Sequence, residues 1–305
     1  MNWFLFSIIA LLCWSGSDFF SKIGCRDAKD KYSHLKMVMA VGLVMGLHAL
    51  VEIIGGVAIS WNVIITYLPV SLLYILSMAM GYIGLRYIEL SISSPICNAS
   101  GALVAVMSLI MGNAEMDHPL QYVAVALACL GVIGLGVVEA TEDKELRAAR
   151  QEASNYKYAK SWLALALPVA YCILDAAGTF ADSIVLEQLG EGMEDAANVA
   201  YELTFFAAGV VCFIYTVIIK KQKLVPKMEA PKYVGALFET AGQLAYIYAL
   251  ADTEHVAMSA PIISSYCMAS VLWSRLFLKE KLSWKHYTAI AVTIAGIIIM
   301  GVFVM

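Results

Sequence analysis

Five acidic side chains lie within otherwise apolar stretches of this chain: Asp18, Glu52, Asp175, Glu202 and Glu239. An aspartate at the centre of a lipid-facing helix costs about 2.5–3.5 kcal/mol, so these acids are expected to face a polar interior. No lysine or arginine lies deep in the same stretches to neutralise them. A carboxylate without a basic partner at low dielectric takes up a proton or binds a cation. The pattern predicts a site for protons or amines; structural hydrogen bonding between helices is the alternative.

Aromatic residues lie at helical spacing from two of these acids. Trp14 precedes Asp18 by four residues, and Tyr171 precedes Asp175 by four, so each ring and its carboxylate share one helix face. A ring beside a carboxylate suits an organic ammonium ion, because cation–π attraction adds about 0.5–2 kcal/mol to the charge interaction. Packing and interfacial positions are the alternative for such rings.

A third face lies in the second half of the chain, where Glu239, Gln243 and Tyr246 follow at i, i+4 and i+7. Asn98 and Tyr266 stand close after the matched prolines Pro95 and Pro261, where interrupted helix backbone can line a cavity. The predicted substrate- and proton-binding residues are Trp14, Asp18, Asn98, Tyr171, Asp175, Glu202, Glu239, Gln243, Tyr246 and Tyr266.

The composition requires these residues to be positioned by membrane-spanning helices. Of 305 residues, 61% are hydrophobic and 14% charged, and the mean hydropathy is +0.77. Soluble domains average about 45–50% apolar and about 25% charged residues. Stretches long enough to span a bilayer are predicted at residues 3–21, 37–61, 63–85, 90–114, 119–138, 161–185, 198–219, 233–251, 256–274 and 287–305. The remaining chain is too dispersed for a soluble catalytic or nucleic-acid-binding domain.

The basic residues divide sharply between the two sides of these ten spans. All 20 Lys and Arg fall in the loops that follow the odd-numbered spans, whereas the opposite side carries acids such as Glu115, Glu187 and Glu254. Basic loops stay in the cytoplasm, so both termini are predicted to lie outside a cytoplasmic membrane.

The two halves of the chain resemble each other. Ser93-Ser94-Pro95 has a counterpart in Ser259-Ala260-Pro261, and Trp14-x3-Asp18 has one in Tyr171-x3-Asp175. Five spans in each half make the second half enter the membrane from the opposite face. Such inverted repeats are typical of secondary transporters. We therefore predict an all-α membrane protein with two inverted five-helix repeats around a central cavity.

Short motifs in the second half carry a family resemblance. Ala260-Pro261, the turn Leu278-Lys279-Glu280-Lys281-Leu282-Ser283 and the glycine-rich last span resemble the EamA-type drug/metabolite transporter superfamily. The first half departs from that pattern, with Gly112-Asn113-Ala114-Glu115-Met116 at the corresponding turn. The resemblance implies a ten-helix carrier that moves small metabolites by alternating access. Relatives are described with cytoplasmic termini, and here we follow the charge partition instead.

The predicted organisation is a first repeat at residues 1–140, a cytoplasmic linker at 141–160 and a second repeat at 161–305. Gly42 and Gly46 are predicted to bring two helices into close contact.

The predicted function is proton-coupled transport of a small organic cation, amine or zwitterion, by a monomer or homodimer. The alternatives are transport of a neutral metabolite with structural acids, or a non-transporting scaffold or channel. Enzyme motifs are missing from the sequence, and we expect no cofactor, metal or nucleic-acid partner.

Overall fold

Helices account for all the regular structure that is described. The computed structural model describes residues 2–25, 30–87, 90–111, 118–141, 162–277 and 282–302, and within these ranges no strand occurs. Eight helical spans are long and apolar enough to cross a membrane. The predicted class, an all-α multi-pass membrane protein, is confirmed.

The first half contains five crossings. They are α1 (Trp3–Cys25), α2 (Ser33–Gly55), α3 (Trp61–Tyr87), the pair α4 (Leu90–Asn98) and α5 (Ser100–Met111), and α6 (Pro119–Ala140). The second half repeats this order with α8 (Trp162–Leu189), α9 (Glu194–Phe213) extended by the π-helix η1 (Ile214–Ile219), α10 (Pro226–Leu250), the short η2 (Thr253–His255), the pair α11 (Val256–Ser264) and α12 (Tyr266–Phe277), and α13 (Trp284–Val302).

Some predicted span ends were wrong. The apolar run 37–61 is not one helix, because Gly56 adopts φ 110° and caps α2, and the next helix begins at Trp61. Pro226 starts α10 ahead of the predicted residue 233, since proline suits the first helical position. Residues 142–161, which hold nearly all of the predicted linker, lie outside the described residues, as do 112–117 and 278–281 in the two family turns. The three-part division of the chain stays a prediction.

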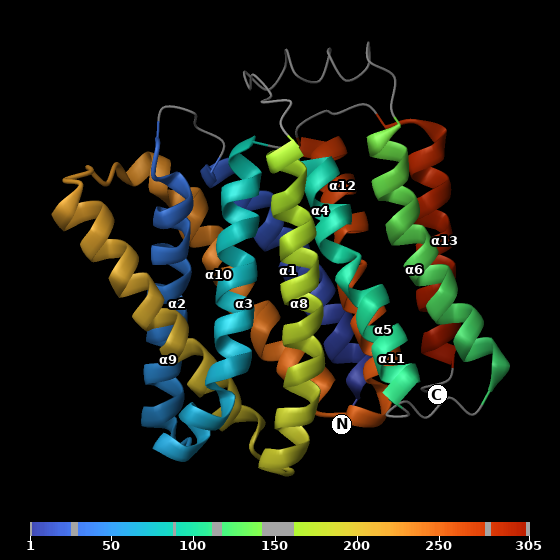
Figure 1. The fold of residues 1–305 in the computed structure, drawn as a ribbon, viewed down its shortest axis with the longest axis horizontal. Helices are drawn as coiled ribbons and strands as arrows, with labels where there is room; N and C mark the ends of the chain where they lie inside the picture. Colours follow the sequence, from blue (N-terminus) through green and yellow to red (C-terminus); the bar gives the residue numbers. More distant parts are fainter. Residues whose placement is uncertain are drawn as a thin grey trace.

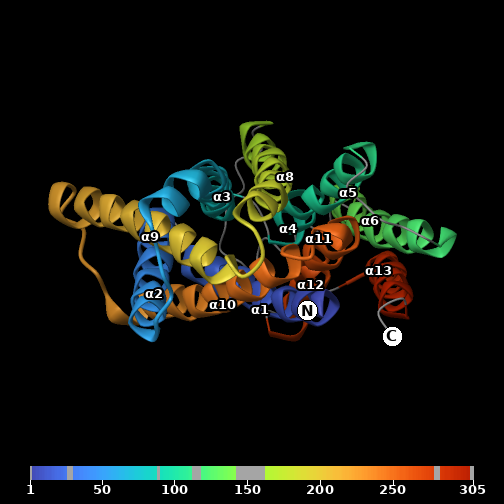
Figure 2. The same ribbon diagram turned by 90° about the horizontal axis from the view of Figure 1, so that it is seen from below.

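Helices of the two halves pack in exchanged pairs. α1 lies along α10 and α3 lies along α8, while α2 pairs with α9 and α6 pairs with α13. Exchanging the halves converts the α1–α10 pairing into α3–α8 and leaves the other two pairings unchanged, as expected for repeats related by a pseudo-two-fold axis. Viewed from the end that carries the termini, α3, α8, α5 and α6 lie along one side of the molecule, and α2, α10 and α1 along the other (Figure 2). Each side therefore mixes helices from both halves.

The ends of the helices alternate between two faces. In Figure 1 the N-terminal end of α1 and the C-terminal end of α13 lie at the lower face, whereas α6 ends and α8 begins at the upper face. We call this upper face the linker face. In the sequence, the loop between α6 and α8 is one of those that follow the odd-numbered spans and hold the basic residues.

The fourth crossing of each half is broken at the same distance from its proline. The N–H group of Ala99, between α4 and α5, is shared between the carbonyls of Pro95 and Ile96. Ser265, between α11 and α12, shares its N–H in the same way between Pro261 and Ile262. The sequence-matched prolines thus mark matched irregularities in the two halves.

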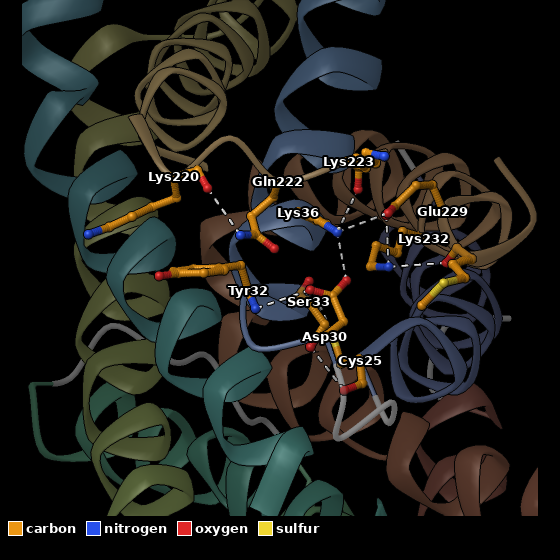
Figure 3. Close-up of polar contacts among 11 residues, drawn as sticks. Cys25, Asp30, Tyr32, Ser33, Lys36, Lys220, Gln222, Lys223, Glu229 and Lys232 are labelled. Carbon is orange, nitrogen blue, oxygen red and sulfur yellow. Dashed lines mark hydrogen bonds and ion pairs between the residues drawn. The ribbon is translucent and has the colours of Figure 1, made fainter. Parts of the chain in front are cut away.

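A buried ion cluster joins helices at the linker face (Figure 3). Lys36 Nζ of α2 lies 2.8 Å from Asp30 Oδ2 and 3.4 Å from Glu229 Oε1 of α10. Lys232 Nζ lies 2.8 Å from the other Glu229 oxygen, Oε2. All four side chains are nearly inaccessible to solvent, so two positive and two negative charges compensate one another away from water.

Close helix contact depends on glycine at Gly42, as predicted. A Cβ atom there would lie 2.7 Å from the Phe205 carbonyl oxygen and 2.9 Å from Gly209 Cα, both backbone atoms of α9. Gly46 likewise faces the ring of Phe206. α2 and α9 therefore touch backbone to backbone.

We expect Gly42→Ala to destabilise the protein by about 1–3 kcal/mol, because the added methyl group must separate two backbones. Gly55→Ala is the matched control on the same helix, since a Cβ atom there meets nothing within 4 Å. Unfolding of both purified variants in one detergent measures the difference. Equal stability of the two would contradict the close contact.

Candidate functional site

A central cavity lies between the two halves of the molecule. Its walls come from α1, α3, α4 and α5 of the first half and from α8 to α12 of the second. It holds roughly 940 Å³ of empty space, including the part open to solvent.

Nine of the ten predicted site residues line this cavity. They are Trp14, Asp18, Asn98, Tyr171, Asp175, Glu239, Gln243, Tyr246 and Tyr266. The tenth, Glu202, is not part of the lining. The cavity thus collects residues that lie more than 250 positions apart in the chain.

Three carboxylates reach the cavity from three helices, and each accepts a hydrogen bond from a serine. Ser94 Oγ donates to Asp18 Oδ2 over 2.6 Å, and Ser100 Oγ donates to Asp175 Oδ2 over 2.7 Å. Ser17 Oγ donates to Glu239 Oε2 over 2.6 Å. A single hydroxyl leaves each carboxylate with capacity to accept further donors.

The lining contains no basic side chain. Among the described residues that form the cavity wall, none is Lys, Arg or His. The lysine at its linker-side end, Lys22, donates from Nζ to the carbonyl of Leu85 over 3.1 Å and so joins α1 to α3. The acids of the wall, Asp18, Asp175 and Glu239, therefore have no basic neighbour among the described lining residues.

Aromatic rings form much of the remaining wall. The Trp14 ring lies 4.9 Å from that of Tyr246 and 6.0 Å from that of Tyr266, centroid to centroid. Glycines allow this crowding: a Cβ atom at Gly242 would lie 2.4 Å from Trp14 Cδ1, and one at Gly81 would lie 2.9 Å from Tyr171 Cδ2. The rings are thereby fixed against neighbouring helices.

A tyrosine network lies at the side of the cavity away from the linker face. Tyr67 donates to Asp182 Oδ1 over 2.6 Å, and the Tyr74 hydroxyl lies 3.4 Å from Asp182 Oδ2. The hydroxyls of Tyr74 and Tyr246 are hydrogen-bonded, and Tyr246 also donates to Thr179 over 3.0 Å. The network connects α3, α8 and α10, so it joins the two halves.

Sequence reasoning missed this network. Asp182 is not among the predicted site residues, yet it is completely buried. The available signal was the i, i+7 spacing of Tyr67 and Tyr74, which places both hydroxyls on one face of α3. Tyr82 and Tyr201 of the cavity wall were missed as well, because neither lies four residues from an acid within its span.

Glu202 lies between α2 and α9 instead. Its oxygens are 2.9 and 3.0 Å from His48 Nδ1. Its side chain is completely buried although it does not face the cavity. Nothing in the spacing of the sequence distinguishes this face of α9 from the one that carries Tyr201.

Residues 182–302 match the family described as the EamA-like transporter family. We call residues 182–302 the EamA-like unit. This match confirms the resemblance seen in the second half. The EamA-like unit begins near the end of α8 and extends through α13, and it contains Glu239, Gln243, Tyr246 and Tyr266. The description of the family is that of a transporter.

Solved structures support the same architecture over the whole length. A crystal structure titled only "Crystal structure of protein" aligns with a TM-score of 0.66 at 14% identity, covering 99% of this chain and 96% of the other. At that identity the likeness concerns the fold alone. In all, 27 chains of solved structures match. No curated protein sequence matches.

The buried Asp182 supplies a test of the tyrosine network. We expect Tyr67→Phe to lower the free energy of unfolding by about 1–3 kcal/mol, because a buried carboxylate loses its shortest hydrogen bond. Tyr122→Phe on the exposed face of α6 is the control, since that ring is 48% exposed. The measurement is unfolding in detergent. A Tyr67→Phe protein as stable as the control would show that Asp182 does not depend on this donor.

Proposed function

We propose that this protein is a secondary transporter of a small organic cation, amine or zwitterion, coupled to protons. The observation that carries the proposal is the combination of three carboxylates from α1, α8 and α10 with aromatic walls and no basic side chain in the described lining. The EamA-like unit supports transport as the general activity.

Charge and ring geometry favour a cationic group. An ammonium ion near Asp18 or Asp175 would gain both Coulomb attraction and the hydrogen-bonding capacity that one serine leaves unused. The rings of Trp14 and Tyr171 stand one helical turn from these acids and would add cation–π attraction. Phosphorylated or nucleotide-sugar substrates are disfavoured, because their recognition needs Arg or Lys in the wall.

Proton coupling follows from competition for the same carboxylates. In a low-dielectric cavity an ionised carboxylate is unfavourable unless a cation accompanies it, so an empty site favours a bound proton. Substrate and proton would then exclude each other at Asp18, Asp175 or Glu239. Release of one on binding of the other couples their movements in opposite directions.

Alternating access would exchange the conformations of the two halves. The tyrosine network joins α3 to α10 on the side away from the linker face, while Lys22 joins α1 to α3 at the linker-side end. Opening one of these contacts while the other closes would expose the cavity to one side at a time.

We expect Asp18→Asn, Asp175→Asn and Glu239→Gln each to weaken amine binding about tenfold or more, since each removes a negative charge from the cavity. Thermal shifts of purified protein with primary amines, quaternary ammonium ions and amino acids identify a binder, and counterflow of that labelled compound in proteoliposomes measures transport. Glu187→Gln, an exposed acid on the same helix as Asp175, is the matched control.

The competing functions have distinct outcomes in this experiment. Unchanged affinity and flux in all three variants would overturn the cation proposal and favour a neutral solute. Single-channel currents without saturable counterflow would favour a channel.

The location that we propose is the cytoplasmic membrane with both termini outside. All 20 Lys and Arg belong in the sequence to loops that follow the odd-numbered spans, and basic loops stay cytoplasmic. A reporter active only outside the cytoplasm should therefore be active when fused to the C terminus, and inactive when inserted after Thr141 at the linker face. The reverse pattern would place the termini inside.

A further inference from the structure

A second polar cluster lies between α2 and α9, apart from the central cavity. It consists of His48 and Glu52 from α2 and of Asn198 and Glu202 from α9, and none of these residues lines the cavity. Two carboxylates surround one imidazole, and no lysine or arginine pairs with them in the described part of the chain.

The geometry of His48 leaves a place for one proton. Nδ1 lies 2.9 Å from Glu202 Oε1, and Nε2 lies 3.7 Å from Glu52 Oε1. A neutral imidazole that donates from Nδ1 to Glu202 turns the lone pair of Nε2 toward the Glu52 carboxylate. Adding a proton at Nε2 replaces this repulsion with attraction and places an imidazolium ion between two carboxylates.

Asn198 provides an independent sign that the cluster is adaptable. The side chain is 1% exposed, and neither its Nδ2 nor its Oδ1 makes a hydrogen bond of ordinary geometry within the described residues, although the amide lies close to Glu202. It stands four residues before Glu202 on the same face of α9. Its N–H group can donate to an ionised Glu202 and its carbonyl can accept from a protonated one, so the amide suits both states of the acid.

Burial increases along the cluster from Glu52 to Glu202. The side chains of Glu52, His48 and Glu202 are 31%, 27% and 0% exposed. Glu52 stands one turn from the end of α2, on the face away from the linker. A proton can thus reach the imidazole from the helix end, whereas Glu202 is sealed behind it.

Other titratable groups near the cluster lie on α9, α10 and α3. On α9, Asp195 accepts a hydrogen bond from Tyr248 of α10, and Glu194 lies beside it at the helix start. On α3, the Tyr74 ring packs edge-on against Tyr201 of α9. The lysines of α2 and α10 lie at the linker face, at the opposite end of these helices.

We propose that His48, Glu52, Asn198 and Glu202 form a proton-binding site distinct from the substrate cavity. Uptake of one proton from water by His48 would strengthen its contact with Glu202 of α9 and add an attraction to Glu52 within α2. Tyr201, the residue before Glu202, lines the cavity and donates to Met78 Sδ of α3, so α9 connects the site to the cavity wall. A role in driving transport rests on the proposed function; the proton site itself does not.

Histidine side-chain NMR of the protein in lipid nanodiscs tests the site directly. The sequence has five histidines, and His48→Gln or His48→Asn, whichever folds, identifies the His48 signal. We expect that signal to change from neutral to charged between about pH 8 and about pH 5. In Glu202→Gln the ratio of charged to neutral His48 at a fixed pH should fall about tenfold, because the nearest negative charge is gone.

Asp252→Asn is the matched control. It removes the carboxylate that lies 2.6 Å from His255 Nδ1, so it should alter the His255 signal and leave His48 unchanged. An unchanged His48 ratio in Glu202→Gln, or a His48 signal constant over the whole pH range, would overturn the proposal. The proposal would also be overturned if the His48 signal differed between sodium chloride and choline chloride at the same pH, since the site would then hold a metal cation.

The result separates this site from the substrate cavity. If no amine binds the cavity, the proposed function fails while the His48 measurement stands. If amines bind and His48 does not titrate, only the second site fails. If both hold, a changed pH dependence of counterflow in Glu202→Gln would assign the site to coupling, and an unchanged one would make it a proton site without that role.

Discussion

The cost of placing a carboxylate in hydrocarbon governs this structure. Every acid within the spans must find donors or a wet cavity, because unpaired charge at that depth opposes insertion. Serine hydroxyls donate hydrogen bonds to Asp18, Asp175 and Glu239, and tyrosine hydroxyls donate to Asp182. The imidazole of His48 lies within hydrogen-bonding distance of Glu202. The same requirement gathers three acids at one cavity and separates the other two into clusters between helices.

Close helix packing determines where the donor side chains can lie relative to the acids. Glycines at positions 42, 81, 178 and 242 let a backbone or an aromatic ring of a neighbouring helix approach to contact distance. At Gly178 the partner is Tyr74, whose hydroxyl joins the tyrosine network. Small residues thus bring large polar ones within hydrogen-bonding range across the interface of the halves.

The sequence could predict what depends on composition and regular spacing. Ten crossings, the one-sided basic loops and the pairing of Trp14-x3-Asp18 with Tyr171-x3-Asp175 follow from hydropathy, charge and helical periodicity. Nine of the ten predicted site residues line one cavity because buried acids and their helical neighbours must share a polar interior. The end of α2 was mispredicted, since an apolar run does not reveal a left-handed glycine.

What periodicity could not supply was the choice of partner across helices. Glu202 and Glu239 look alike in sequence, yet one turns to His48 and the other to the cavity, because that choice depends on which helix packs against each face. Asp182 likewise required knowledge that α3 lies along α8. The partners of these side chains are determined by which helices pack together, and residue spacing along the chain does not reveal that packing.

The ion cluster at the linker face has a consequence for how the protein responds to its surroundings. Dissolved salt screens charges that water can reach, and it screens enclosed ones far less. Lys36, Glu229 and Lys232 are almost entirely enclosed, whereas Lys220 and Lys221 nearby are exposed. An increase in ionic strength will therefore weaken the attraction between the exposed lysines of this face and anionic lipid headgroups. The ion pairs that connect α2 to α10 will keep their strength.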